Sequence, residues 1–120
     1  MNILVVDDDQ DTVALLTMLL ERQGWCVGTA TSVEEARAAL VDSEYGVLVA
    51  DLHLPDGNGL SLAGVGKKLR GAILVTGGED YEQRRASFGL GWNRCLTKPV
   101  AGAEVVATIR QLLDPNTTRP

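Results

Sequence analysis

Short runs of apolar residues recur along this 120-residue chain, and most of them end at a charged or hydroxyl side chain. The clearest run, residues 47–50, is β-branched, uninterrupted and leads directly into Asp51. Continuous rather than alternating apolar runs are typical of strands that are buried on both faces of a parallel sheet. The pattern predicts five such strands, at residues 3–6, 25–30, 47–50, 72–75 and 94–97.

Helical periodicity separates these runs. It predicts helices that begin at residue 11 and close at Gly24, and at residues 36–40, 60–69, 79–88 and 103–113. Thr31 and Ser32 precede two glutamates, as expected for a helix N-cap with an acidic first turn. The helix at 60–69 contains Gly64 and Gly66, so we expect it to be marginal.

Strands that alternate with helices predict an α/β fold, a parallel sheet with helices on both faces. The length suits one domain, which we assign to residues 1–113. Residues 114–120 have the composition of a tail or the start of a linker.

Charge and composition narrow the function. The net charge is −5 and no basic run occurs, so direct binding of nucleic acid by this domain is not expected. No apolar stretch approaches the roughly 20 residues that span a bilayer, so no membrane insertion is expected. The first residues lack the basic region of a signal peptide, and a cytoplasmic protein is predicted.

Side chains with chemistry follow four of the five predicted strands: Asp7 and Asp8, Asp51, Thr76, and Lys98. The carboxyl ends of parallel strands share one edge of the sheet, where open α/β folds place their ligand site. Three neighbouring carboxylates repel one another unless a cation lies among them. Oxygen ligands of this kind suit Mg²⁺, so a magnesium site is predicted. Asp51 is then a candidate nucleophile towards phosphorus, with Lys98 and Thr76 stabilising the phosphoryl oxygens.

The chain resembles the receiver domain of two-component response regulators over nearly its whole length. The resemblance rests on the spacing of a few residues: the pair Asp7-Asp8, Asp51 in the segment DLHLPDGNG, Thr76 at a strand end, and Lys98-Pro99. The stretch between Asp51 and Thr76 is shorter than the family pattern.

The resemblance implies a flavodoxin-like three-layer sandwich, with a five-stranded parallel sheet of order 2-1-3-4-5 and five helices. It implies a signalling phosphoacceptor rather than an enzyme, phosphorylated on Asp51 by a histidine kinase or a histidine phosphotransfer protein. Mg²⁺ would be held by the acidic pair Asp7 and Asp8, by Asp51 and by the backbone carbonyl of His53. The bond between Lys98 and Pro99 would be cis, as in the family.

The family's output surface corresponds here to residues 79–88, 94–97 and 103–113. An effector domain or a downstream protein would bind this surface, and a phosphorylation-dependent dimer is a further option. The family has an aromatic switch residue three positions before the lysine, where this chain has Cys95. The consequence of that difference is not predicted by the sequence.

Two alternatives remain at this point. In the first, the chain is a pseudo-receiver, a platform for interactions without functional phosphorylation; Cys95 and the shortened third helix favour it. In the second, it is a phosphatase of the haloacid-dehalogenase type, with Asp7 as nucleophile and Asp9 as its partner. Asp11 stands where that family has threonine or valine, and no clear second acidic pair follows the lysine, which weighs against the phosphatase.

Overall fold

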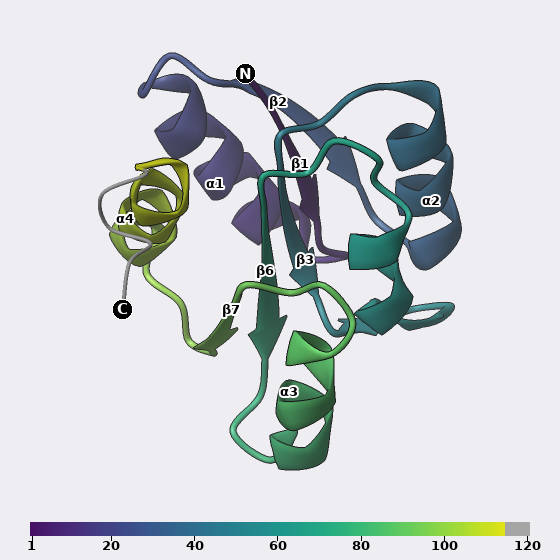
Figure 1. The fold of residues 1–120 in the computed structure, drawn as a ribbon. Helices are drawn as coiled ribbons and strands as arrows, with labels where there is room; N and C mark the ends of the chain where they lie inside the picture. The colour runs from purple at the N-terminus through teal and green to yellow at the C-terminus, as the bar shows by residue number, and fades with distance from the viewer. Residues whose placement is uncertain (115–120) are drawn as a thin grey trace.

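A five-stranded parallel sheet forms the centre of the molecule (Figure 1). The structure is a computed structural model and describes residues 1–114. The strand order is β2-β1-β3-β6-β7, which is the predicted order 2-1-3-4-5 when the strands of this sheet are numbered along the chain. The strands are β1 (Asn2–Val6), β2 (Cys26–Ala30), β3 (Val47–Asp51), β6 (Gly71–Thr76) and β7 (Arg94–Thr97).

Four α-helices complete the three-layer α/β architecture: α1 (Gln10–Glu21), α2 (Val33–Asp42), α3 (Tyr81–Phe88) and α4 (Gly102–Leu113). Helices α1 and α4 lie on one face of the sheet, and α2 lies on the other face (Figure 1). The predicted N-cap is confirmed, since the Ser32 side chain accepts a hydrogen bond from the backbone N–H of Glu35. Asp9 caps α1 in the same manner, with Asp11 as the donor.

The two faces of the sheet have separate apolar cores, because successive side chains of a strand point to opposite faces. On the α1 and α4 face, Ile3, Val5 and Val49 pack with residues such as Leu20 and Ile109. On the other face, the alternate strand residues pack with α2, the segment after β5 and Trp92. The fully buried leucines of that core are Leu4, Leu48, Leu52, Leu62 and Leu74. All five residues of β3 are buried, as predicted for a central parallel strand.

The prediction of a helix at residues 60–69 is wrong. This segment contains a 3-10 turn, Leu60–Gly64, so the described part of the chain has four α-helices and one 3-10 turn instead of five helices. Glycine costs about 1 kcal/mol relative to alanine inside a helix, and Gly64 and Gly66 fall in the segment. Leu62, which is fully buried, anchors the turn to the core.

A short antiparallel hairpin follows β3 and is not anticipated by the sequence. It pairs β4 (His53–Leu54) with β5 (Gly57–Asn58). Gly57 has φ of 147°, a backbone conformation that favours glycine. The hairpin is fixed to the start of α2, because the Asp56 carboxylate accepts hydrogen bonds from the N–H groups of Val33 and Glu34.

None of the helices within residues 1–114 is both long enough and apolar enough to cross a membrane. The tail or linker predicted for 114–120 lies outside the described residues, except for the exposed Asp114.

Candidate functional site

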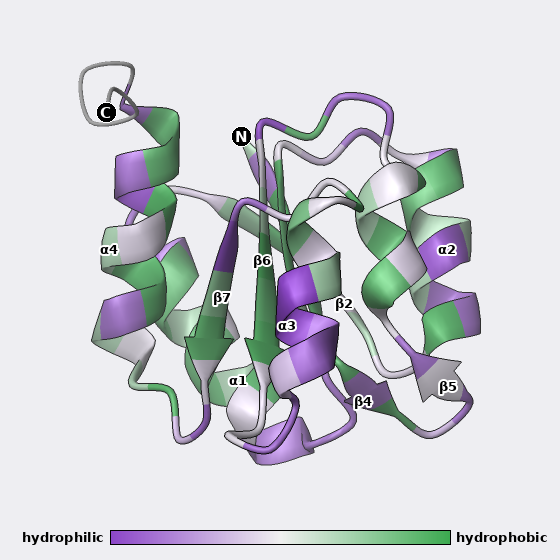
Figure 2. Ribbon diagram, turned by 60° about the horizontal axis from the view of Figure 1, so that its bottom comes forward, coloured by the Kyte–Doolittle hydropathy of each residue, from purple (hydrophilic) through white to green (hydrophobic). Residues whose placement is uncertain are grey.

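The carboxyl edge of the sheet gathers the side chains that the sequence singles out. Asp7 and Asp8 follow β1, Asp51 is the last residue of β3, and Thr76 is the last residue of β6. Lys98 follows β7 directly. In Figure 2 the arrowheads of β6 and β7 point to the same end of the molecule. The ribbon of β6 is strongly apolar, and the loops beyond its arrowhead become polar. The predicted convergence of these groups on one edge is therefore found in the structure.

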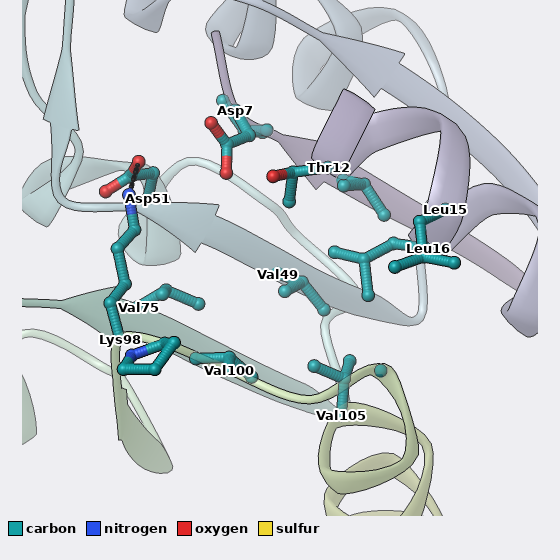
Figure 3. Close-up of a pocket in the computed structure, with 14 residues that line it drawn as sticks. Asp7, Thr12, Leu15, Leu16, Val49, Asp51, Val75, Lys98, Val100 and Val105 are labelled. Atoms are coloured by element: carbon teal, nitrogen blue, oxygen red, sulfur yellow. Dashed lines mark hydrogen bonds and ion pairs between the residues drawn. The ribbon is translucent and has the colours of Figure 1, made fainter. Parts of the chain in front are cut away.

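Asp51 and Lys98 form the closest charged contact of the site (Figure 3). Lys98 Nζ donates a hydrogen bond to Asp51 Oδ2 at 2.6 Å. Asp51 is only 4% exposed, because β3 lies between β1 and β6 in the middle of the sheet. The peptide bond between Lys98 and Pro99 is cis, as the resemblance implied.

Three carboxylates form one cluster. Ligand oxygens of Asp7, Asp8 and Asp51 lie within 4.8 Å of one another, and Asp7 and Asp51 are buried whereas Asp8 is exposed. Asp7 Oδ1 accepts the backbone N–H of Asp9 at 2.9 Å. Burial raises the pKa of Asp7, and the charges of Asp51 and Asp8 raise it further. A hard divalent cation among these oxygens removes that repulsion, so the donor set fits Mg²⁺.

The raised pKa of Asp7 has a consequence for stability. A carboxyl whose pKa is higher in the folded state favours folding when it is protonated. The stability that Asp7 contributes is therefore present at low pH and is lost as the pH rises through its raised pKa. We expect Asp7→Asn to increase the free energy of unfolding at neutral pH by at most about 1 kcal/mol, since the edge is open to screening by solvent. Urea unfolding with a chelator present measures the difference, and added Mg²⁺ should stabilise the unsubstituted protein more than the variant. A variant less stable than the parent protein under chelation would contradict the assigned repulsion.

The acidic charges that raise the pKa of Asp7 also raise the pKa of Lys98, where they favour the charged form. Burial lowers its pKa, but the hydrogen bond and charge of Asp51, with the charges of Asp7 and Asp8, raise the pKa overall. Lys98 therefore stays protonated at neutral pH, and the stability that it contributes is lost only as the pH rises through its raised pKa. The site thus holds one permanent cation against three acidic side chains.

Thr76 presents an unused donor. Its residue is fully buried, and its hydroxyl oxygen has no hydrogen-bond partner in the described structure. An unsatisfied buried hydroxyl costs about 1–3 kcal/mol and is uncommon in folded proteins. The Thr76 hydroxyl is therefore a donor without a partner at the end of the strand next to β3. Gly77 follows Thr76, and its backbone N–H donates to the Asp80 carboxylate at 2.9 Å.

His53 lies two residues after Asp51, and its backbone N–H donates to Asp51 Oδ1 at 3.2 Å. Its side chain points to a residue that the sequence analysis did not select: His53 Nε2 lies 3.0 Å from both carboxylate oxygens of Asp80. The hydrogen bond from His53 lowers the pKa of Asp80, and the bond from the N–H of Gly77 adds to this effect. Asp80 lies within the helix predicted at residues 79–88, and no sequence signal distinguishes it from a solvent-facing residue of that helix.

An apolar cavity of about 470 Å³ opens beside the charged cluster, between α1 and the segment that leads into α4 (Figure 3). Asp7, Asp51 and Lys98 stand at one end of it in the close-up. Its walls are largely aliphatic and include Leu16, Val49, Val75, Val100 and Val105. These walls lower the local dielectric constant, which strengthens the interaction between Lys98 and Asp51.

Cys95 occupies the position of the family's aromatic switch residue. It is half-buried in β7, and its Sγ lies 3.5 Å from the hydroxyl oxygen of Ser87 on α3. A surface hollow at this place is lined by Cys95 and by side chains of α3, including the exposed Tyr81 and Phe88. No bulky side chain at position 95 fills the space beside α3.

Comparison with known proteins agrees with this geometry. The family described as "Response regulator receiver domain" matches residues 3–110. An uncharacterised 14.6 kDa protein of Leptolyngbya boryana is 38% identical over 116 residues, which cover 92% of this chain and 88% of that protein. A transcriptional regulatory protein of Pectobacterium parmentieri is 29% identical over 97% of this chain. The chain spans about half the length of such regulators, 54% in this example.

Solved structures give the same result. A CheY-like receiver domain from Methanospirillum hungatei has a TM-score of 0.87, with 29% identity over 98% of this chain and 96% of that one. A response regulator from Burkholderia pseudomallei, solved with a phosphorylated aspartic acid, a calcium ion and citrate, has a TM-score of 0.81. It is 26% identical, over 98% of this chain and 68% of that one. With sheet order, acidic cluster and family match in agreement, the chain belongs to the response regulator receiver domain family of two-component signalling.

Proposed function

We propose that this chain is a phosphoacceptor module that receives a phosphoryl group on Asp51 from the phosphohistidine of a histidine kinase or a histidine phosphotransfer protein. The single observation that carries the proposal is the buried Asp51 carboxylate, held at 2.6 Å from Lys98 inside the acidic cluster. The phosphorylated aspartic acid in the similar Burkholderia pseudomallei regulator supports the same chemistry.

The transfer exchanges one bond to phosphorus for another. An oxygen of Asp51 forms the new bond, and the bond from phosphorus to the donor nitrogen breaks, with the electron pair leaving on the imidazole. The Lys98 ammonium offsets the negative charge of the transferring oxygens, and the unpartnered Thr76 hydroxyl donates to one of them.

Magnesium completes the proposed site. Asp7, Asp8 and Asp51 would hold the ion, together with the backbone carbonyl of His53. When bound, the ion neutralises the carboxylates and the phosphoryl oxygens, so that an anionic donor can approach them.

A cytoplasmic location and an output through the face made by α3, β7 and α4 belong to the same proposal. Tyr81, Phe88 and Leu90 are exposed apolar residues on or just after α3. An effector domain, a downstream protein or a second copy in a phosphorylation-dependent dimer would bind this face. The regulators related to this chain are about twice its length, which supports an attached effector domain as one form of the output.

Incubation with a small acyl phosphate and Mg²⁺ tests the proposal. We expect one phosphoryl group per chain, released by hydroxylamine and absent when a chelator replaces the ion. If no phosphoryl group is taken up under any condition, the phosphoacceptor function is rejected and the pseudo-receiver is favoured. Cys95 and the absence of a helix at residues 60–69 already support that alternative. Catalytic release of phosphate from monoesters, lost in Asp7→Asn, would instead support the haloacid-dehalogenase alternative.

Lys98→Ala is expected to slow phosphoryl uptake from the same donor by about 100-fold, the effect of removing one preorganised charge from a transition state. Lys68→Ala is a matched control, because Lys68 forms an ion pair with Glu44 at 3.0 Å far from the site and largely in solvent. The initial rates of mass increase compare the two variants. Equal rates in both would show that Lys98 does not act on the phosphoryl group.

A further inference from the structure

Asp80 connects the two loops that flank the proposed phosphorylation site. It is 6% exposed and immediately precedes α3, yet its side chain makes no capping hydrogen bond to that helix. One of its oxygens, Oδ2, accepts the backbone N–H of Gly77 at 2.9 Å. Both oxygens lie 3.0 Å from His53 Nε2. We refer to these contacts of His53, Asp80 and Gly77 as the clasp.

The clasp ties together segments that are far apart in sequence. His53 belongs to β4 and also donates its backbone N–H to Asp51, the proposed phosphoacceptor. Gly77 follows Thr76, whose buried hydroxyl has no partner. The loop after β3 is thus linked to the loop after β6, and the link ends at Asp80, the residue immediately before α3.

An anion on Asp51 would compete with the clasp. A phosphoryl group needs several donors, and the nearest after the Thr76 hydroxyl along the backbone is the N–H of Gly77, which Asp80 already occupies. One N–H group makes one well-aligned hydrogen bond, so the two acceptors exclude each other. His53 also brings Asp80 close to the site, because its backbone N–H donates to Asp51 Oδ1 while its side chain lies 3.0 Å from the Asp80 carboxylate. Added negative charge on Asp51 therefore repels the Asp80 carboxylate.

We infer that the clasp holds the loop after Thr76 and the start of α3 in their unmodified arrangement, and that a phosphoryl group on Asp51 releases it. The inference rests on the proposed phosphoacceptor function. It supplies a path from Asp51 to α3 in a chain where Cys95 replaces the aromatic switch residue. Asp80 and His53 are positioning residues in this path, because they act through Gly77 and α3.

The test uses the whole chain, with Mg²⁺ and beryllofluoride as a stand-in for the phosphoryl group, followed by amide NMR. His53→Ala removes the bridge and keeps the backbone, and its side chain is largely exposed, so the fold is retained. Asp80→Ala removes both contacts. We expect Asp80→Ala to bind beryllofluoride about tenfold more tightly than the unsubstituted protein, because it frees the N–H of Gly77 from a competing charged hydrogen bond. His53→Ala keeps the bond from Gly77 to Asp80 and loses only the bridge, so its gain in affinity should be smaller. Without beryllofluoride, the amide resonances of residues 81–88 in each variant should already be shifted towards the chemical shifts that they have in the unsubstituted protein with beryllofluoride bound.

Asp56→Ala is the matched control. It removes a carboxylate of the same hairpin that accepts two backbone N–H groups at the start of α2, and it leaves the clasp intact. Its affinity for beryllofluoride should stay within about twofold of the unsubstituted value. The clasp inference is overturned if the clasp variants bind beryllofluoride with unchanged affinity and show no shift in residues 81–88. If Thr76 and Lys98 of the unsubstituted protein still respond to beryllofluoride, the phosphoacceptor function stands. If Thr76 and Lys98 do not respond in the unsubstituted protein, the phosphoacceptor function fails and the clasp inference fails with it.

Discussion

An Asp51→Asn variant is expected to take up no phosphoryl group from a small acyl phosphate in the presence of Mg²⁺. The carboxamide keeps the size of the side chain, but its oxygen carries no full charge and is a poor nucleophile. The change also removes the acceptor of the Lys98 ion pair and one of the three acidic groups in the cluster. Intact mass measured over a time course reports the uptake.

Asp56→Asn controls for the loss of one aspartate close in sequence. Asp56 is exposed and contacts the start of α2, so this variant should be phosphorylated at the rate of the unsubstituted protein. Circular dichroism of both variants checks that the fold is kept. Undiminished uptake in Asp51→Asn would place the phosphoacceptor elsewhere in the cluster.

Leu62→Ala is expected to lower the free energy of unfolding by about 2–4 kcal/mol, the range for truncation of a fully buried leucine. Leu62 is 0% exposed and packs in the same core as Leu48, Leu52 and Leu74. It anchors a segment that has only a 3-10 turn, so neighbouring helical structure cannot compensate for the cavity.

Urea unfolding measures this loss, and Val41→Ala is the control because Val41 is 65% exposed on α2. We expect the control to change stability by less than about 0.5 kcal/mol. A loss below about 1 kcal/mol in Leu62→Ala would mean that the segment after β5 is not held by this side chain.

The three central strands could be predicted from the sequence because each is a short apolar run buried on both faces, whereas the edge strands β2 and β7 are only partly buried. The strand order was implied by the resemblance to receiver domains and not by these runs. The clearest examples are Val47 to Ala50 in β3 and Ile3 to Val6 in β1, because each has four consecutive buried residues followed by an acid. The convergence of Asp51, Thr76 and Lys98 followed from parallel topology, in which strand ends share an edge.

Long-range contacts could not be predicted in this way. The pairing of His53 with Asp80 joins residues 27 positions apart, and no local pattern relates the two positions. The hairpin of β4 and β5 is too short to leave an alternating signal. The segment 60–69 has the apolar spacing of a helix, but Gly64 and Gly66 weaken the helix enough for a single turn anchored by Leu62 to replace it.

The most direct test of the account is to locate the phosphoryl group in the phosphorylated protein. Reduction with borohydride converts an aspartyl phosphate to homoserine, and peptide mass spectrometry then identifies the modified position. The account predicts modification of Asp51 alone. Modification of Asp7, of Asp8 or of any other residue with Asp51 unchanged would contradict it.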